Sequence, residues 1–395
     1  MAGKLTLVVN PGSASRKYAL YRGKTRLAAL HFETENGEVV YTITVGGRKP
    51  KEQNKAGVNH VAFAATRLVG ILSEYKILSK QEKLDVIGVR VVAPASFFAQ
   101  HRNLDSRALE LLKSLEPYAQ LHINATLQEI ELLGSLFPKT PLIGASDSAF
   151  HASKPERAHV YAIPQSDAKN LDIWRYGYHG LSVASVVAQL ERAKQLPKRL
   201  IVCHIGSGVS VTAVQEGKSI DNTMGYSPLE GPVMATRSGS IDPSAVMVIA
   251  RRLRLDNQGI ERYLNLQGGL FGLSEGMSDI RELLVGEKAD NKKAVLALEV
   301  FVYRLQQSIG QMAAVLKGVD GLVFTGTVGE RSYLMRQRIM NGLLYLGLSL
   351  DHAKNQTTKL THDIVHIQQA RHPAPVMVVP ANEDVSIMEA IDTVL

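Results

Sequence analysis

The chain has 395 residues, with 45 Lys and Arg against 37 Asp and Glu, and carries a formal net charge of +8 at pH 7. This length is sufficient for two separate cores, and a composition of 45% apolar and 21% charged residues is ordinary for a globular enzyme. The basic residues are scattered in short groups without interleaved aromatic side chains. The charge therefore does not indicate a nucleic-acid partner, and it suits small anionic ligands.

Cysteine usage and the apolar runs favour a protein of the cytoplasm. Cys203 is the only cysteine, so no intrachain disulfide can form, and a reducing compartment is expected. The first apolar stretch ends at Val9, which is too short for a secretory leader, and no run approaches the length of a membrane span. Cys203 lies inside an apolar strand, where we expect a packing thiol rather than a nucleophile.

Apolar periodicity predicts strands alternating with helices along the whole chain. The first half is predicted to hold strands at 5–10, 18–21, 39–44, 85–92 and 141–145, and helices at 58–75, 106–115 and 124–133. The second half is predicted to hold strands at 199–204, 209–214, 321–325 and 376–379, with a long helix at 292–317 and a last helix opened by 382–384. Asp242-Pro243 supplies a helix N-cap followed by proline at the first helical position. The alternation predicts an α/β fold with mixed sheets.

Two segments, 5–16 and 199–210, carry the same pattern of an apolar run, one polar residue, a small-residue turn and a second run. At a spacing of 194 residues the gapless alignment pairs Asn10 with His204, Gly12 with Gly206, and Ser13 with Ser207. Each copy predicts a β-hairpin whose turn allows close approach of backbone N–H groups to phosphate oxygens. One Gly-Ser turn is more often a plain hairpin, but two copies favour a duplicated unit whose halves face each other across a nucleotide cleft. This pattern resembles the superfamily of acetate and sugar kinases, heat-shock ATPases and actin.

Further segments resemble the acetate kinase family, which includes propionate and butyrate kinases, in order and over nearly the whole chain. The longest matching block is 224–242, and others lie at 89–92, 121–124, 147–151, 175–180, 272–274, 278–281, 324–330 and 380–383. The resemblance implies duplicated actin-like, ribonuclease H-like ATPase domains with mixed sheets. It also implies an acyl-substrate-side domain at 1–148 plus 383–395 and a nucleotide-binding domain at 149–382.

The activity implied by this resemblance is in-line phosphoryl transfer between ATP and a short-chain carboxylate. With acetate the reaction is ATP + acetate = ADP + acetyl phosphate, and it requires Mg²⁺ or Mn²⁺. Such a reaction brings two anions together, so charge neutralisation and alignment dominate catalysis, and arginine binds oxygen pairs bidentately. The resemblance assigns catalytic roles to Arg90, Asp147, His179 and Arg237, and a metal site to Asn10 and Glu383. Glu383 has a plain alternative, because an acidic residue in a first helical turn stabilises the helix dipole without metal.

The resemblance also assigns the binding residues. It places the acid in a small apolar pocket formed by Val92, Leu121, Tyr178 and Pro228, with Arg90 on the carboxylate, although core packing explains such residues equally well. The nucleotide and its phosphates are assigned to Ser13, Lys17, His122, His204, Gly206, Ser207, Gly208, Asp279, Arg281, Gly326, Thr327 and Gly329. For Arg237 the plain alternative is a salt bridge near the Asp242 helix cap.

The chain departs from the family pattern at several of these places. Ala93-Pro94-Ala95 stands where His-Gly-Gly is usual, and Tyr178, Ser207, Ser240 and Thr327 replace Phe, Asn, Asp and Gly. The acid therefore stays open between acetate, propionate and butyrate, and the phosphoryl donor between ATP and pyrophosphate. A nucleotide-binding protein without catalysis is a third reading, against which the joint presence of the ionisable residues argues. The resemblance also implies a homodimer, without indicating its interface.

Overall fold

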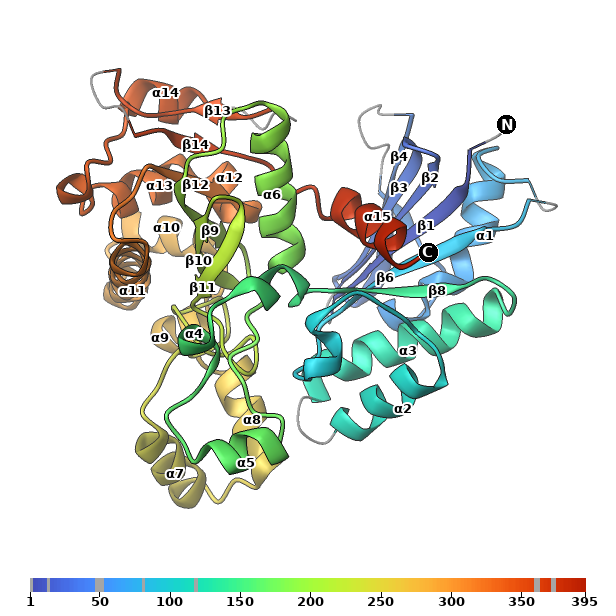
Figure 1. Ribbon diagram of the computed structural model, residues 1–395, viewed down its shortest axis with the longest axis horizontal. Helices are drawn as coiled ribbons and strands as arrows, with labels where there is room; N and C mark the ends of the chain where they lie inside the picture. The colour runs from blue at the N-terminus through green and yellow to red at the C-terminus, as the bar shows by residue number, and fades with distance from the viewer. Residues whose placement is uncertain are drawn as a thin grey trace. The chain divides into compact units, whose positions relative to one another are not determined.

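The computed structural model describes residues 3–12, 15–46, 53–79, 82–116, 120–358, 363–370 and 374–395, the side chains of 120–122 excepted. The chain forms two compact units: unit 1 is Met1–Ala149 with Glu383–Leu395, and unit 2 is Phe150–Asn382 (Figure 1). Within the described ranges, no helix has the length and apolar character needed to cross a membrane.

Unit 1 is built on one mixed sheet with the strand order β5-β4-β3-β2-β1-β6-β8-β7. The strands are β1 (Leu5–Pro11), β2 (Ser15–Arg22), β3 (Thr25–Glu35), β4 (Glu38–Val45), β5 (Asn54–Lys55), β6 (Val86–Val91), β7 (Arg102–Asn103) and β8 (Leu142–Ser146). Strand β1 runs antiparallel to β2 and parallel to β6, which in turn runs parallel to β8.

Helices cover the two faces of this sheet. They are α1 (Ala65–Glu74), α2 (Ser106–Leu115), α3 (Gln120–Leu136) and, from the far end of the chain, α15 (Glu383–Val394). Val89 belongs to the core cluster that includes side chains of α1 and α3. Because neighbouring strand residues point to opposite faces, Gly88 and Arg90 lie on the other face, where Ile387 and Ile391 of α15 pack over Gly88. Figure 1 shows this last helix beside β1 and β6.

Unit 2 repeats this plan. Its sheet has the order β11-β10-β9-β12-β14-β13, formed by β9 (Arg199–Ile205), β10 (Val209–Gln215), β11 (Lys218–Asn222), β12 (Gly321–Thr325), β13 (Val365–His366) and β14 (Val376–Val378). The run β11-β10-β9-β12-β14 matches β3-β2-β1-β6-β8 in order and in direction, with two antiparallel pairs followed by two parallel pairs. The predicted duplication of an α/β unit with mixed sheets is therefore confirmed.

The helices of unit 2 surround this sheet and extend beyond it. They are α4 (Glu156–His159), α5 (Gln165–Asn170), α6 (Gly180–Arg192), α7 (Pro243–Arg252), α8 (Asn257–Leu266), α9 (Gly269–Ser274), α10 (Ile280–Lys288), α11 (Lys292–Leu316), α12 (Gly326–Arg331), α13 (Tyr333–Met340) and α14 (His352–Thr357). Helix α11 packs on β9, β10 and β11, and α6 contributes Val183 and Val186 to a core with Val202 and Val323. In Figure 1 these two helices lie on opposite sides of the sheet.

The predicted elements are present, with differences at a few places. Strand β3 was not predicted, although its alternation of buried Ala28, Leu30 and Phe32 with less buried neighbours is the pattern of a half-buried strand. The segment 326–330, which follows the predicted strand 321–325, forms most of the short helix α12. Asp242 caps α7 as predicted, with its carboxylate accepting from the N–H of Ser244.

The contact between Gly88 and α15 predicts a stability effect. A Cβ at Gly88 would lie 2.6 Å from Ile391 Cδ1 and 2.7 Å from Ile387 Cγ2. Overpacking of this kind costs about 1–3 kcal/mol, so Gly88→Ala should lower the free energy of unfolding by that amount in chemical denaturation. The control is Gly134→Ala in α3, where a Cβ meets nothing within 4 Å and should stabilise by about 0.5–1 kcal/mol. Equal effects of both changes would contradict the packing argument.

Candidate active site

Three parallel strands of unit 1 end side by side, and each brings a polar side chain to that end. Asn10 lies near the end of β1, Arg90 near the end of β6, and Asp147 directly after β8. The carboxyl ends of parallel strands meet at one edge of a sheet, which is where α/β proteins bind ligands. Glu383, the first residue of α15, joins them because this helix covers the sheet face on which Arg90 lies.

These four side chains form one connected cluster. The Arg90 guanidinium donates from Nε and Nη2 to Asp147 Oδ1 and Oδ2, at 3.2 and 2.9 Å. Its Nη1 donates to Asn10 Oδ1 at 3.2 Å and lies 3.7 Å from Glu383 Oε2, which accepts from Asn10 Nδ2 at 2.7 Å. The Asp147 side chain is 1% exposed, whereas those of Arg90 and Glu383 are 19% and 17% exposed. A buried carboxylate thus anchors a guanidinium that still reaches the surface.

The charges of this cluster keep Arg90 protonated. Burial alone lowers the pKa of the Arg90 guanidinium, but the negative charges of Asp147 and Glu383 outweigh burial and raise it above its ordinary value. One cation therefore faces two carboxylates, and the cluster carries a formal excess of negative charge. Such an excess favours the approach of a further cation.

Of the remaining residues that the resemblance assigned to unit 1, some lie outside the part of the chain that the structure describes. Ser13 lies outside the described residues, as do the side chains of Leu121 and His122, whose backbone belongs to α3. Lys17 pairs with Asn10 across the hairpin of β1 and β2, and its side chain is exposed.

Unit 2 presents a pair of stacked histidines. His179 is the N-cap residue of α6 in a left-handed conformation with φ of 60°, and His204 lies in β9. Their rings stack with centroids 4.0 Å apart and an interplanar angle of 29°. Two buried hydroxyls orient them, because His179 Nδ1 lies 3.0 Å from Ser210 Oγ and His204 Nδ1 lies 2.8 Å from Ser182 Oγ.

Arg237 meets His179 at the second glycine turn. A Cβ at Gly208 would lie 3.0 Å from His179 Nε2 and 3.4 Å from Arg237 Nη1, so both groups converge on this backbone. Arg237 Nη1 also donates to the carbonyl of Pro228 at 3.0 Å. Asp242 caps α7, where its carboxylate accepts from the N–H of Ser244 at 2.7 Å.

At each glycine turn the first glycine donates a backbone hydrogen bond, although the two bonds span different numbers of residues. Gly206 donates its N–H to the carbonyl of Gly208 at 2.9 Å, and Gly12 donates to that of Ser15 at 2.9 Å. In unit 2 the parallel pairing of β9 with β12 sets Thr325 opposite His204, so α12 begins beside this turn. Both copies of the repeated motif therefore close a hairpin at the end of the first strand of their sheet.

The residues assigned to the adenosine side lie on two short elements. Gly326 has φ of 78°, and a Cβ there would lie 2.9 Å from the carbonyl oxygen of Ile205, so glycine is required. Thr327 is exposed in α12, and Gly329 is buried. Asp279 caps α10 and pairs with Arg281, whose side chain is 89% exposed, at 2.6 Å. These two residues thus have a local structural role whether or not a nucleotide is bound.

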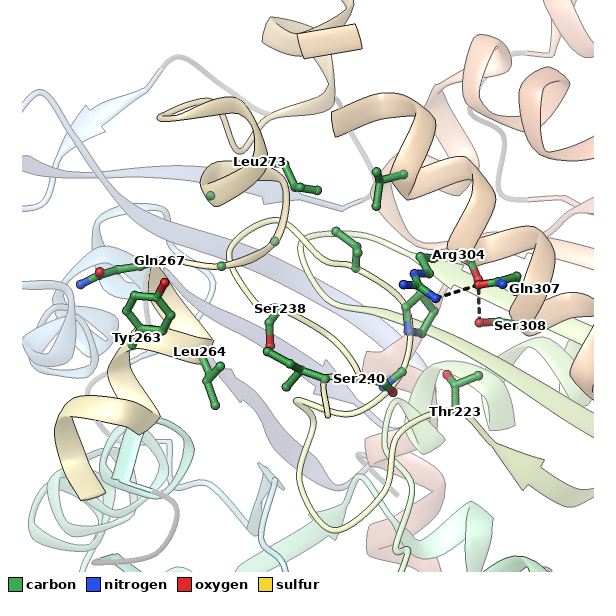
Figure 2. A pocket seen from close by; sticks show the side chains of 18 of the residues that line it. Thr223, Ser238, Ser240, Tyr263, Leu264, Gln267, Leu273, Arg304, Gln307 and Ser308 are labelled. Atoms are coloured by element: carbon green, nitrogen blue, oxygen red, sulfur yellow. Dashed lines mark hydrogen bonds between the residues drawn. The ribbon is translucent and has the colours of Figure 1, made fainter. Parts of the chain in front are cut away.

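A cavity of about 660 Å³ in unit 2 is lined by Ser238, the residue that follows Arg237 in the chain (Figure 2). Polar side chains of Ser238, Ser240, Gln267, Arg304 and Gln307 line it together with apolar ones, and none of the site residues assigned above is among its lining.

The structure shows what the serine at position 240 does. Its Oγ accepts from the N–H of Gly231 at 3.1 Å and its N–H donates back to the Gly231 carbonyl at 2.9 Å, so serine supplies the acceptor that this turn requires.

Several residues that support the site were missed from the sequence. Ser182 and Ser210 orient the histidines, and Arg175 and Glu230 form an ion pair beside the 224–231 loop. No local signal links Ser182 to His204 or Ser210 to His179, because these pairs are 22 and 31 residues apart. No local signal indicates the Arg175–Glu230 pair, because its members are 55 residues apart.

The duplicated mixed sheets are those of the actin-like, ribonuclease H-like class of α/β fold. The model of the acetokinase family matches residues 5–389, and the chain belongs to this family. It is a phosphotransferase with a carboxyl group as acceptor.

Known proteins resemble the chain over nearly its whole length. It is 32% identical over 393 residues to an acetate kinase of Sulfurovum sp. (strain NBC37-1), with 98% of each chain covered. A propionate kinase structure from Francisella tularensis subsp. tularensis SCHU S4 superposes with a TM-score of 0.88 at 31% identity, covering 99% of this chain and 100% of that one. The structure of Porphyromonas gingivalis acetate kinase gives a TM-score of 0.84 at 29% identity with the same coverage.

The convergence at Gly208 predicts that a side chain at this position disturbs His179. A Cβ there would lie 3.0 Å from His179 Nε2, so Gly208→Ala should shift this ring by a fraction of an ångström and lower kcat by less than the ~10²-fold loss typical of a reacting group misplaced by 1 Å. Circular dichroism and the melting temperature should show a folded protein. A folded variant with wild-type kcat would show that His179 does not act from the position described.

Proposed function

We propose that this chain catalyses reversible phosphoryl transfer between ATP and acetate, forming ADP and acetyl phosphate. The observation that carries the proposal is the Arg90 guanidinium, anchored bidentately by the buried Asp147 at the carboxyl ends of parallel strands and still 19% exposed. A guanidinium fixed in this way presents a planar cation of the shape that a carboxylate or phosphoryl oxygen pair requires.

Each charged group has a proposed role in this reaction. Arg90 binds the carboxylate of the acid, and Asp147 orients Arg90. Arg237 and His179 donate to the oxygens of the transferring phosphoryl group, where negative charge must be stabilised in the transition state. His204, Lys17, His122, Ser13 and the turn Gly206-Ser207-Gly208 bind nucleotide phosphates. The adenosine side is bound by Asp279, Arg281, Gly326, Thr327 and Gly329.

A divalent metal ion, Mg²⁺ or Mn²⁺, fits the cluster of unit 1. Mg²⁺ is usually held by one or two carboxylates together with substrate phosphates and waters, not by a complete protein shell. The described residues contain no group of three or more metal-ligating side chains, whereas Glu383 offers one accessible carboxylate next to the amide of Asn10. We propose that Glu383 and Asn10 hold the metal directly or through water. When bound, the ion neutralises phosphate charge.

The acid is proposed to lie against Val92, Leu121, Tyr178 and Pro228. Tyr178 is buried, and its hydroxyl donates to the carbonyl of Tyr226 at 2.6 Å. The polar atom is therefore satisfied by backbone, and the ring can offer an apolar surface to a short acyl chain. Propionate is a second candidate, because one structural relative is named a propionate kinase. Pyrophosphate remains the alternative donor.

We further propose that the protein acts as a cytoplasmic homodimer and that α7 contributes to the interface. All residues of this helix are at least partly exposed, and Met247 and Val248 are 61% and 53% exposed, with Leu253 just after the helix 54% exposed. Burial of these exposed apolar side chains against a second copy of the chain would remove apolar surface from water.

The function is tested by a coupled assay that crosses acetate, propionate and butyrate with ATP and pyrophosphate. We expect turnover with acetate and ATP in the presence of Mg²⁺, and a fall in kcat of at least about 10²-fold in Arg90→Ala, because a pre-organised charge contact is lost. Removal of Mg²⁺ with a chelator should abolish turnover. No turnover with any pair by the folded wild-type protein would refute the proposal.

The donor preference can be tested at Thr327. Because this residue lies in a helix, alanine removes its hydroxyl and methyl groups without the backbone freedom that glycine would add. If Thr327 narrows the adenine side, Thr327→Ala should tighten ATP binding in calorimetry and leave the KM for acetate unchanged. Turnover of the wild type with pyrophosphate and none with ATP would show instead that the donor is pyrophosphate.

A further inference from the structure

An ion-pair cluster beside the 224–231 loop is not used by the proposed mechanism. The Glu230 carboxylate accepts from Arg175 Nη1 through Oε1 and from the Tyr161 hydroxyl, at 2.5 Å, through Oε2. Arg175 also donates from Nη2 to the carbonyl of Asn222 at 3.2 Å, and its guanidinium lies 5.5 Å from the centre of the Tyr161 ring. We name these three residues, Arg175, Glu230 and Tyr161, the loop clamp.

The loop clamp holds the backbone on both sides of Pro228. On the N-terminal side, the N–H of Tyr226 donates to the Tyr161 hydroxyl at 2.9 Å. On the C-terminal side, Glu230 is itself part of the clamp. A Cβ at Gly225 would overlap both Glu230 Oε2 and Tyr161 Oη, so the clamp presses directly on the loop backbone.

Pro228 connects this clamp to the proposed chemistry. Its carbonyl accepts from Arg237 Nη1 at 3.0 Å, and the same nitrogen lies against Gly208, where His179 converges. The position of the Pro228 carbonyl therefore helps to fix the direction of the guanidinium. The clamp in turn fixes that carbonyl from two residues before it and two residues after it.

We propose that Glu230 is a positioning residue for phosphoryl transfer, which acts on Arg237 through the carbonyl of Pro228. Arg175 and Tyr161 hold its carboxylate in place. The proposal rests on the proposed role of Arg237. It also predicts that the loop clamp affects the rate only as long as Arg237 is present.

A double-mutant cycle with the full-length protein tests the proposal, using acetate and ATP with Mg²⁺. Glu230→Ala should lower kcat by about 10–10²-fold, and Arg237→Ala by about 10²–10³-fold. Adding Glu230→Ala to Arg237→Ala should lower kcat by less than about 2-fold further, because residues that act through one another are not additive. Tyr161→Phe removes only the bridging hydroxyl and should show the same non-additivity with a smaller single effect.

Glu287→Ala is the matched control. Glu287 pairs bidentately with Arg338 at 2.9 and 2.5 Å, and the exposed fractions of the two side chains, 27% and 32%, are close to the 31% and 19% of Glu230 and Arg175. This change should lower stability without affecting kcat. The positioning role would be overturned if the fold-losses in kcat of Glu230→Ala or Tyr161→Phe multiplied with that of Arg237→Ala in the double variant. Wild-type kcat in both Glu230→Ala and Tyr161→Phe would overturn it as well. An inactive wild type would instead count against the proposed function itself.

Discussion

The buried carboxylate of Asp147 is the constraint on which the rest of unit 1 depends. A carboxylate with 1% of its surface exposed is strongly destabilising unless a cation and hydrogen-bond donors satisfy it. Removing one partner of a buried ion pair typically costs about 3–5 kcal/mol, so Arg90 has little freedom to leave Asp147. Asp147 thereby holds the Nε and Nη2 side of the guanidinium, and this orients the remaining Nη1 toward Asn10 and Glu383.

This arrangement also explains why the end of the chain returns to its first unit. Arg90 lies on the sheet face opposite the α3 side, and β6 has glycine at position 88 on that same face. A glycine leaves room for Ile387 and Ile391 of α15, and their packing brings Glu383 to within 3.7 Å of Arg90. Apolar packing thus decides the position of a carboxylate that lies more than 290 residues away in the sequence.

The duplicated plan places different chemistry at equivalent positions. Asn10 and His204 stand at the ends of β1 and β9, which are the central strands of matching sheets. Asn10 is tied to charged side chains, whereas His204 is held by the hydroxyl of Ser182 and by stacking on His179. Each sheet thus has an equivalent edge at the carboxyl ends of its parallel strands, and the side chains at that edge determine what it can bind.

The fold was largely predictable, because apolar runs and glycine turns act within a few residues. The repeated motif at 5–16 and 199–210 indicated the two sheets, and Asp242-Pro243 indicated the start of α7. The convergence of Arg90 with Asp147 was predictable from their places at strand ends, whereas their proposed roles came from the resemblance and remain predictions. The supporting contacts were not predictable.

Those supporting contacts depend on loops that lie far apart in sequence. The Tyr178 hydroxyl finds the carbonyl of Tyr226, and Ser240 finds the backbone of Gly231, 48 and 9 residues away. Both are positions where the chain departs from the family pattern, and in both the side-chain oxygen bonds to the backbone of the 224–231 loop. Tyr178 is buried, and a buried polar atom costs free energy unless it is hydrogen-bonded, so its hydroxyl is compatible with the fold only while the carbonyl of Tyr226 stays in place. The Tyr178 hydroxyl therefore ties down the same loop from which the Pro228 carbonyl holds Arg237.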